Sequence, residues 1–357
     1  MHPARTAALR SLLPHARTLH LEEGADALER RLEKVVDLYC DGFNGVAGIE
    51  GQWTHRRARQ FLHDRTQRPG LVSLLLCDDD HVIGACFGVL SLKVDGVWST
   101  DWDLLVHPDY RGGGLGRDLF YRALECAAET ALATFGERPA MIEFSTYRRP
   151  KFPRNWWVSL GHQAFSLYSA KFNAPAYGAV VNDIVMREVR FNDVDGVVAF
   201  MTAPDVRDAN GLQWSARRAA LFVASLLENP ASVQRVALAR DEIVAVIAAD
   251  LVMRRGGFFL TQLSLICRPL AAPPSSALMA RLLAELADNA NQRGFHAYDK
   301  AVAGLELTEP QARRFRPALR NIRRDEDFIG MSAPFETVMA VMQSSAIPER
   351  LMPLQHR

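Results

Sequence analysis

Apolar and polar positions in the first half of the chain follow helical spacing and then strand spacing. Apolar side chains recur at helical intervals over residues 24–43 and 54–66, and Thr54 is suited to cap the second segment. Three β-rich runs follow closely, at 70–79, 81–94 and 96–108, with turn-forming residues between them. The pattern predicts two helices followed by a three-stranded antiparallel meander.

A longer helical pattern follows the meander. Residues 116–135 place small and apolar side chains on one side of a helix, and a glycine-rich loop precedes it. A strand at 139–146, a short helix at 154–161 and a strand at 162–172 complete the first half. With a first strand at 17–21, the order is β-α-α-β-β-β-α-β-α-β. This order predicts an α+β or mixed α/β fold, with a mostly antiparallel central sheet flanked by helices.

The second half repeats this order of elements after a break. Residues 173–182, which contain Pro, Gly and Asn, interrupt any pattern and are expected to be a linker. A strand, two helical segments, three β-rich runs, a long helix and a strand follow at similar lengths, although few residues are shared. A duplicated fold is the economical explanation. We expect domains at 1–172 and 183–357, with loop and helix from about residue 310 onward.

Composition excludes several classes of function. The 357 residues hold 42 Lys and Arg against 41 Asp and Glu, so the chain has no overall basic field for binding nucleic acid. The five cysteines are scattered and never form a Cys-x-x-Cys pair, which argues against a disulfide framework and a metal site. No apolar run approaches the roughly 20 residues that span a bilayer. We therefore expect a cytoplasmic protein without a membrane partner.

The glycines before the long helix are the strongest chemical signal. Gly112, Gly113, Gly114 and Gly116 leave backbone amides uncovered where a strand meets a helix N-terminus. The positive end of the helix dipole favours an anion there, and a phosphate or pyrophosphate fits best. The Walker pattern fails because no Lys-Ser or Lys-Thr follows the glycines. The Gly-x-Gly-x-x-Gly dinucleotide pattern fails because the preceding strand belongs to an antiparallel meander.

The string VHPDYRGGGLG, which starts at Val106, resembles the acyl-CoA-binding motif of the GNAT superfamily of N-acyltransferases. That motif reads Gln/Arg-x-x-Gly-x-Gly/Ala after a strand, and Arg111, Gly114 and Gly116 fill its fixed positions. The resemblance implies that the loop amides hold the pyrophosphate of acetyl-CoA, and that the preceding strand pairs with its pantetheine arm. The residues carried over in this way are Leu104, Leu105, Val106, Arg111, Gly112, Gly113, Gly114, Leu115, Gly116 and Arg117.

Members of this superfamily usually let a neutral amine attack the thioester directly in a ternary complex. That reaction needs a base for the ammonium, a partner for the oxyanion and an acid for the leaving thiolate. The backbone N–H near Val106 is the candidate oxyanion contact. Asp101 and Asp103, on one face of the same strand by alternation, are candidate bases, and Glu143 is a third. The alternative for each acid is a side chain that faces solvent or, for the two aspartates, binds a substrate cation.

The acid is where the match breaks. The segment that corresponds to the superfamily's usual Tyr reads NWWVSLGH, and Trp157 stands in place of the Tyr. Indole has no proton to give. Tyr147, Tyr168, Ser159 or water would then protonate the thiolate, the thiolate would leave unassisted, or the protein binds without turnover. His107 and His162 are further candidate acids or bases, against a structural role for each.

The second half lacks the motif. Residues 267–276 read CRPLAAPPSS, with no glycine and with two consecutive prolines that remove N–H donors. This loop cannot cradle a pyrophosphate in the same way. We interpret the second half as a degenerate GNAT-like domain that completes the acceptor cleft, braces the first domain or dimerises. An unrelated α+β domain with the same order of elements is the alternative.

These observations predict an acyltransferase. The resemblance implies an N-acetyltransferase that moves an acetyl group from acetyl-CoA, without a metal, to a primary amine of a small molecule. A protein lysine or N-terminal acetyltransferase is one alternative, and a non-catalytic acyl-CoA-binding regulator is another. A homodimer is a further expectation. The acceptor is left open because fold resemblance does not encode it.

Overall fold

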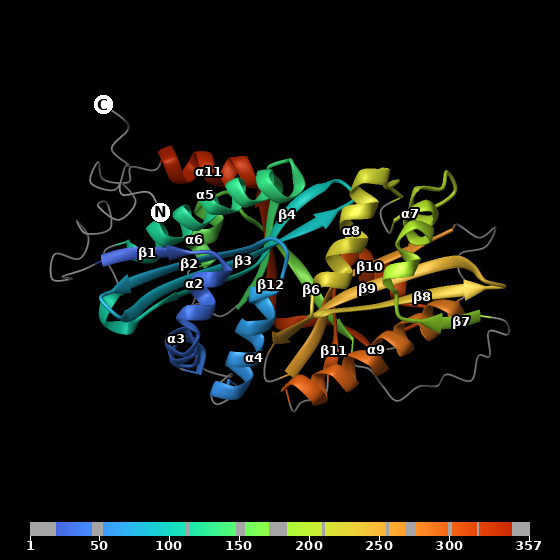
Figure 1. Ribbon diagram of the computed structural model, residues 1–357, viewed down its shortest axis with the longest axis horizontal. Coiled ribbons are helices and arrows are strands. Elements are labelled where there is room, and N and C mark those ends of the chain that lie inside the picture. Colours follow the sequence, from blue (N-terminus) through green and yellow to red (C-terminus); the bar gives the residue numbers. More distant parts are fainter. Residues whose placement is uncertain are drawn as a thin grey trace. The chain divides into compact units, whose positions relative to one another are not determined.

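Figure 1 shows a computed structural model of the chain. The structure describes residues 19–44, 53–111, 114–147, 154–170, 184–208, 211–254, 257–268, 276–298, 302–319 and 321–344. The chain forms two compact units. Unit 1 comprises residues 1–91, 96–164 and 330–357, and unit 2 comprises residues 92–95 and 165–329.

The sheet of unit 1 contains the predicted meander. β1 pairs antiparallel with β2, β2 pairs antiparallel with β3, and β4 pairs parallel with β5. The strand order is β1-β2-β3-β4-β5-β12. The bounds are β1 (Leu19–Glu23), β2 (Leu71–Asp78), β3 (His81–Lys93), β4 (Gly96–Val106), β5 (Pro139–Tyr147) and β12 (Ile322–Pro334), of which residues 330–334 belong to this unit.

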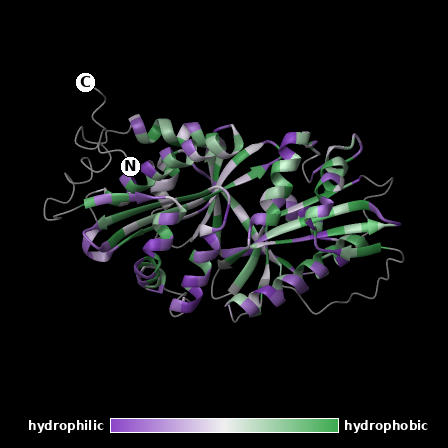
Figure 2. Ribbon diagram, viewed as in Figure 1, coloured by the Kyte–Doolittle hydropathy of each residue, from purple (hydrophilic) through white to green (hydrophobic). Residues whose placement is uncertain are grey.

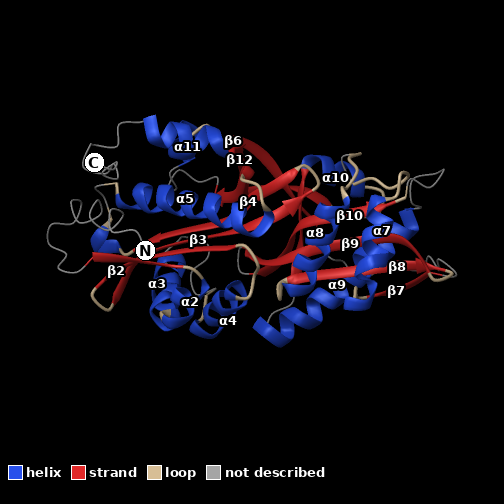
Figure 3. Ribbon diagram, turned by 45° about the horizontal axis from the view of Figure 1, so that its top comes forward, coloured by secondary structure: helices blue, strands red, loops and turns tan. Residues whose placement is uncertain are grey.

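Helices cover both faces of this sheet, as Figure 3 shows, with α2, α3 and α4 on one face and α5 and α11 on the other. Thr54 caps α4 as predicted, because its hydroxyl accepts a hydrogen bond from the Arg57 amide. Phe87 on β3 and Phe120 on α5 are fully buried in the core. The bounds are α2 (Ala25–Arg30), α3 (Leu32–Asn44), α4 (His55–Thr66), α5 (Leu115–Phe135), α6 (Arg154–Ser159) and α11 (Phe335–Ser344).

Unit 2 has a sheet of the same kind, in the order β6-β11-β10-β9-β8-β7. β7 to β10 pair antiparallel in sequence, and β10 pairs parallel with β11. The strands are β6 (Gln163–Ala170), β7 (Ile184–Arg187), β8 (Ser232–Ala239), β9 (Glu242–Arg254), β10 (Gly257–Cys267) and β11 (Val302–Thr308). The helices are α7 (Val194–Thr202), α8 (Ala216–Glu228), α9 (Ser276–Tyr298) and α10 (Glu309–Phe315).

The two halves repeat at a constant offset. α4 and α8 begin at residues 55 and 216, β2 and β8 at 71 and 232, and β4 and β10 at 96 and 257, so each pair lies 161 positions apart. The same offset aligns a Trp-x-x-Arg-Arg-Ala-x-x-Phe motif that starts at Trp53 and at Trp214. The Trp and Phe rings of the motif lie 5.1 Å apart in unit 1 and 4.8 Å apart in unit 2. The two halves therefore share this motif in addition to their order of elements.

The last strand of each half of the sequence lies partly in the other unit. β6 ends the first half of the sequence, yet residues 165–170 belong to unit 2, where β6 pairs antiparallel with β11. β12 ends the second half, yet residues 330–334 belong to unit 1 beside β5. The helix expected beyond residue 310 is present as α10 and α11, but the strand β12 was not expected. The predicted domain bounds, 1–172 and 183–357, describe the two halves of the duplicated sequence and stay a prediction.

Hydropathy follows the layers of each unit. In Figure 2 the strands are predominantly hydrophobic, whereas α4 is largely hydrophilic. This distribution is that of two ordinary globular cores. Among the helices in the described part of the chain, none is both long and apolar enough to span a membrane.

Candidate functional site

β4 and β5 pair over only part of their length. Their ladder runs from Val97 opposite Pro139 to Thr100 opposite Glu143, where the pairing between described residues ends. The next residue, Asp101, has a φ of 54°, a left-handed conformation that is uncommon for a residue other than glycine. Such a residue bends a strand and interrupts pairing. We call residues 101–106 of β4 the splayed segment, because among the described residues no pairing with β5 follows Thr100.

The splayed segment leads directly to the glycine loop. Gly114 caps the N-terminus of α5 with a φ of 89°, and a Cβ at this position would meet no atom within 4 Å. Glycine is needed here for its conformation, and the space beside it is open. The first N–H groups of α5 have no partner within the helix, and the positive end of its dipole points the same way. Gly112 and Gly113 lie outside the described residues.

Strand end and helix start lie against each other. A Cβ on Gly116 would lie 3.6 Å from Val106 and 3.7 Å from Leu104, so these two side chains face the first turn of α5. Leu105 is buried on the opposite side, against Gly42 of α3. Arg111 turns back, and its Nε donates to the Val106 carbonyl at 2.9 Å. Of the described residues predicted to hold the pantetheine arm and the pyrophosphate, the side chains of Leu104 and Val106 thus lie beside the first turn of α5, which also holds Leu115 and Arg117, whereas Leu105 points away from it.

The two candidate bases on β4 are held by arginines of α4 and its C-terminal turn. Arg65 Nη2 lies 3.1 Å from Asp103 Oδ2, and the Tyr39 hydroxyl donates to the same oxygen at 3.2 Å. Arg68 Nη1 lies 3.8 Å from Asp101 Oδ2. Both arginines are buried. The sequence pattern did not indicate these partners, although acids in an apolar strand require either solvent or a cation as a partner.

Glu143 and Val106 lie at the two ends of the splayed segment. Glu143 is half-buried and forms the last pair of the ladder, opposite Thr100. Val106 is the last residue of β4, and the following amide, of His107, donates to Ile83 at 2.9 Å. The proposed roles of Asp101, Asp103 and Glu143 as bases, and of the Val106 amide as oxyanion contact, stay predictions.

Trp157 lies in a cluster of aromatic rings. Its ring centroid is 4.6 Å from Phe144 and 5.2 Å from Phe120. His162 closes the cluster, and its Nδ1 donates to the Trp157 carbonyl at 3.1 Å. Burial lowers the pKa of His162 to about 4, so the imidazole is neutral near pH 7 and is not a strong acid there. Of the alternative donors, Ser159 donates to the Trp156 carbonyl at 2.6 Å.

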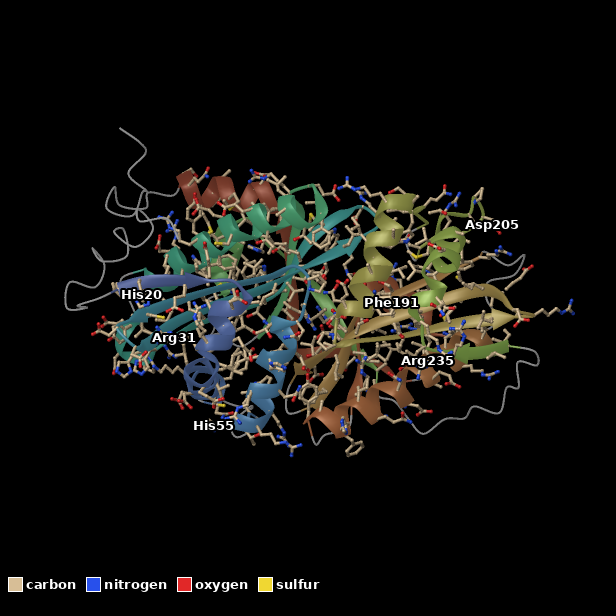
Figure 4. All side chains as sticks on the ribbon, viewed as in Figure 1. His20, Arg31, His55, Phe191, Asp205 and Arg235 are labelled. Carbon is tan, nitrogen blue, oxygen red and sulfur yellow. The ribbon has the colours of Figure 1, made fainter. Side chains whose placement is uncertain are left out.

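One trio of side chains has the atoms of a metal site but not its chemistry. The ligand atoms of His20, Glu22 and Cys77 lie within 4.8 Å of one another. Arg31, which Figure 4 labels together with His20, holds the Glu22 carboxylate at 2.8 Å. Burial raises the pKa of the Cys77 thiol to about 11, so the sulfur is protonated. A guanidinium and a protonated thiol do not favour a cation.

Unit 2 has the same interrupted ladder, but there a side chain of unit 2 binds the strand backbone beyond the interruption. β10 and β11 pair as far as Leu260 opposite Leu305, and Gln262 has a φ of 54°, 161 positions after Asp101. The Gln311 side chain of α10 then donates to the Leu263 carbonyl at 2.8 Å. The chain itself thereby occupies a backbone acceptor beyond the interruption. The loop before α9 lies outside the described residues.

The splayed segment and the N-terminus of α5 lie within a region that matches a family model. Residues 32–144 match the family model described as acetyltransferase (GNAT) family. No curated protein matches the chain. Among solved structures, a tandem GNAT protein from the clavulanic acid biosynthesis pathway shares 12% identity at a TM-score of 0.51, covering 89% of this chain and 99% of its own. This likeness shows the tandem GNAT fold.

Two further solved structures match over a similar share of this chain. The GCN5-related N-acetyltransferase from Sphaerobacter thermophilus shares 13% identity at a TM-score of 0.46, covering 89% of this chain and 96% of its own. The putative acetyltransferase from Pyrococcus horikoshii shares 11% identity at a TM-score of 0.48, covering 88% of this chain and 89% of its own.

Proposed function

We propose that the chain is an N-acetyltransferase that moves the acetyl group of acetyl-CoA to a primary amine of a small molecule. One observation carries the proposal. The splayed segment of β4, which follows the end of the described pairing with β5, leads within a few residues to the glycine-capped N-terminus of α5. An extended amide-containing arm that ends in a pyrophosphate matches both parts at once.

The residues of unit 1 then divide the reaction as follows. The amine nitrogen attacks the thioester carbonyl, a C–N bond forms, the C–S bond breaks, and the amine loses a proton while the thiolate gains one. Asp101 and Asp103 on the splayed segment, and Glu143 on β5, are the candidate proton acceptors. The Val106 amide is the candidate donor to the oxyanion. A water supplies the last proton in place of the missing Tyr, or the thiolate leaves unassisted.

Binding without turnover is the second candidate function. It is favoured by Trp157, which is buried among aromatic rings where a proton donor is expected. Release of free thiol with any primary amine separates the two functions. Tight binding of acetyl-CoA without thiol release over a broad amine panel supports the second.

The loop is tested by titrating acetyl-CoA into the protein in a calorimeter. We expect one site per chain and a loss of affinity of about 10- to 100-fold in Gly114→Ala, because the methyl group enters the loop and displaces hydrogen bonds to a charged group. Gly24→Ala is the matched control. Gly24 also has a φ of 89°, also caps a helix of unit 1, and also has no atom within 4 Å of an added Cβ.

The control separates backbone strain from the loss of a binding site. If Gly24→Ala lowers the affinity as much as Gly114→Ala, the effect belongs to strain and the loop assignment fails. If the wild-type protein does not bind acetyl-CoA, the proposed function is wrong.

A further inference from the structure

Four charged residues lie together on the α4 face of β4. The two ion pairs described above join Arg65 to Asp103 and Arg68 to Asp101, and all four residues are buried or half-buried. Removing charges from water is costly, and a buried ion pair is on balance weak support for a fold. The presence of two buried ion pairs in unit 1 is therefore not explained by stability alone.

The second half of the chain serves as an internal control. At an offset of 161 positions, Arg65, Arg68, Asp101 and Asp103 correspond to Leu226, Asn229, Gln262 and Ser264. Unit 2 nevertheless forms the same helix, the same strand and the same positive φ in that strand. The fold does not need the charges, and they are present only in the unit that has the glycine loop.

Arg65 has unused hydrogen-bonding capacity. Its Nη2 faces Asp103, and its guanidinium lies 4.6 Å over the ring of Phe61. Its Nε and Nη1 are buried and have no hydrogen-bond partner among the residues that the structure describes. Buried donors on a cation without acceptors are unfavourable, and an anionic oxygen is the acceptor that would satisfy them best.

Building on the proposed function, we propose that Arg65 binds a carboxylate of the acceptor, so that the acceptor is an amine that also carries a carboxylate. Asp103 lies inside the splayed segment and next to Arg65, so a molecule with an ammonium and a carboxylate meets a charge of opposite sign at both of its ends. A plain amine leaves the two Arg65 donors unsatisfied. Arg65 is in this sense a specificity-determining residue.

The experiment compares matched acceptors. A panel of α-, β- and ω-amino acids is assayed for thiol release from acetyl-CoA beside the corresponding carboxamides, which keep the amine and remove the negative charge. We expect kcat/KM for the preferred amino acid to exceed that of its carboxamide by at least about 30-fold. In Arg65→Leu, which introduces the residue found in unit 2, this ratio should fall to near one.

Arg68→Asn is the matched control, because it also replaces a buried arginine by the residue of unit 2. It should leave the ratio between acid and carboxamide unchanged. Arg65→Leu combined with Asp103→Ser restores the complete pair of unit 2, so it avoids an unpaired buried carboxylate. We expect calorimetry to detect binding of the N-acetylated amino acid to the wild-type protein with CoA, and no binding to this double variant.

The outcomes are distinct. Equal use of acids and carboxamides by the wild-type protein overturns the role of Arg65 and leaves the proposed function standing. A loss in Arg65→Leu that is the same for both members of a pair assigns Arg65 a structural role and also overturns it. Absence of thiol release with every amine overturns the proposed function and this inference together.

Discussion

β4 of unit 1 and β10 of unit 2 carry the same irregularity but are met by different residues. Asp101 and Gln262 share a φ of 54°. The two parallel ladders end at Thr100 and Leu260, which are one position apart when the halves are aligned at the offset of 161. In unit 1 the strand continues past the interruption to a helix that Gly114 caps. In unit 2 the Gln311 side chain donates a hydrogen bond to the Leu263 carbonyl, just beyond the interruption. The comparison teaches that the interrupted strand is a property of the fold. The loop and the charged residues around it make it a candidate site.

Lowering the pH should destabilise unit 1 because His162 is buried in its neutral form. This is the largest effect on the free energy of unfolding that we expect. Its pKa is about 4 in the folded state against about 6.5 when unfolded, so the unfolded state alone takes up a proton as the pH falls from 6.5 to 4. Stability is unaffected above pH 6.5 and should fall by about 3 kcal/mol by pH 4. Denaturant titrations of the wild-type protein and of His162→Phe measure the difference.

The variant is needed because Asp118 acts in the opposite sense. Burial raises its pKa to about 6, so its contribution to stability grows as the pH falls through that value. The difference between the wild-type protein and His162→Phe cancels this contribution. A difference that does not change between pH 6.5 and 4 contradicts the burial of a neutral imidazole.

The side-chain pair between β3 and β4 of unit 1 differs from the corresponding pair of unit 2, and substitutions can convert the first pair into the second. A Cβ on Gly88 would lie 2.7 Å from the Trp102 ring, whereas unit 2 has Ala249 and Leu263 at the corresponding positions. Gly88→Ala should destabilise unit 1 by about 1–3 kcal/mol through overpacking. Adding Trp102→Leu should recover part of this loss. A double-mutant cycle in urea measures the coupling, and additive effects would contradict the contact.

The helix caps should behave alike, with the smallest effects. Thr54 and Ser215 lie 161 positions apart, and each hydroxyl accepts from the amide three residues later, at 3.3 and 3.4 Å. Thr54→Ala and Ser215→Ala should each cost about 1 kcal/mol. Hydrogen exchange of α4 and α8, followed by mass spectrometry, assigns each loss to its unit. A loss confined to one helix would show that the repeat is not equivalent at this position.

Local signals made one part of the site predictable. The glycine loop, the meander and the long helix are encoded in adjacent residues, because conformation at Gly114 and the spacing of apolar side chains depend on neighbours. The resemblance to the GNAT motif rests on the same short string. The residues that were found are therefore those of the loop and of the strand before it.

The remaining features depend on distant parts of the chain. Arg65 and Asp103 are far apart in sequence, and nothing in either segment specifies the other as a partner. Alternation within a strand indicates which face is buried, but not which neighbouring strand accepts its hydrogen bonds. The destinations of β6 and β12 were for this reason not visible in the pattern.

The position of the end of β12 beside β5 has a consequence for synthesis. A ribosome releases β5 long before residues 330–334, with about 180 residues between them. At roughly 5–20 residues per second, the strand that belongs beside β5 arrives about 10 to 40 s later. During this interval the nascent first unit presents an unpaired strand edge, a template for mispairing or a target for chaperones. We therefore expect the yield of folded protein to depend on translation speed.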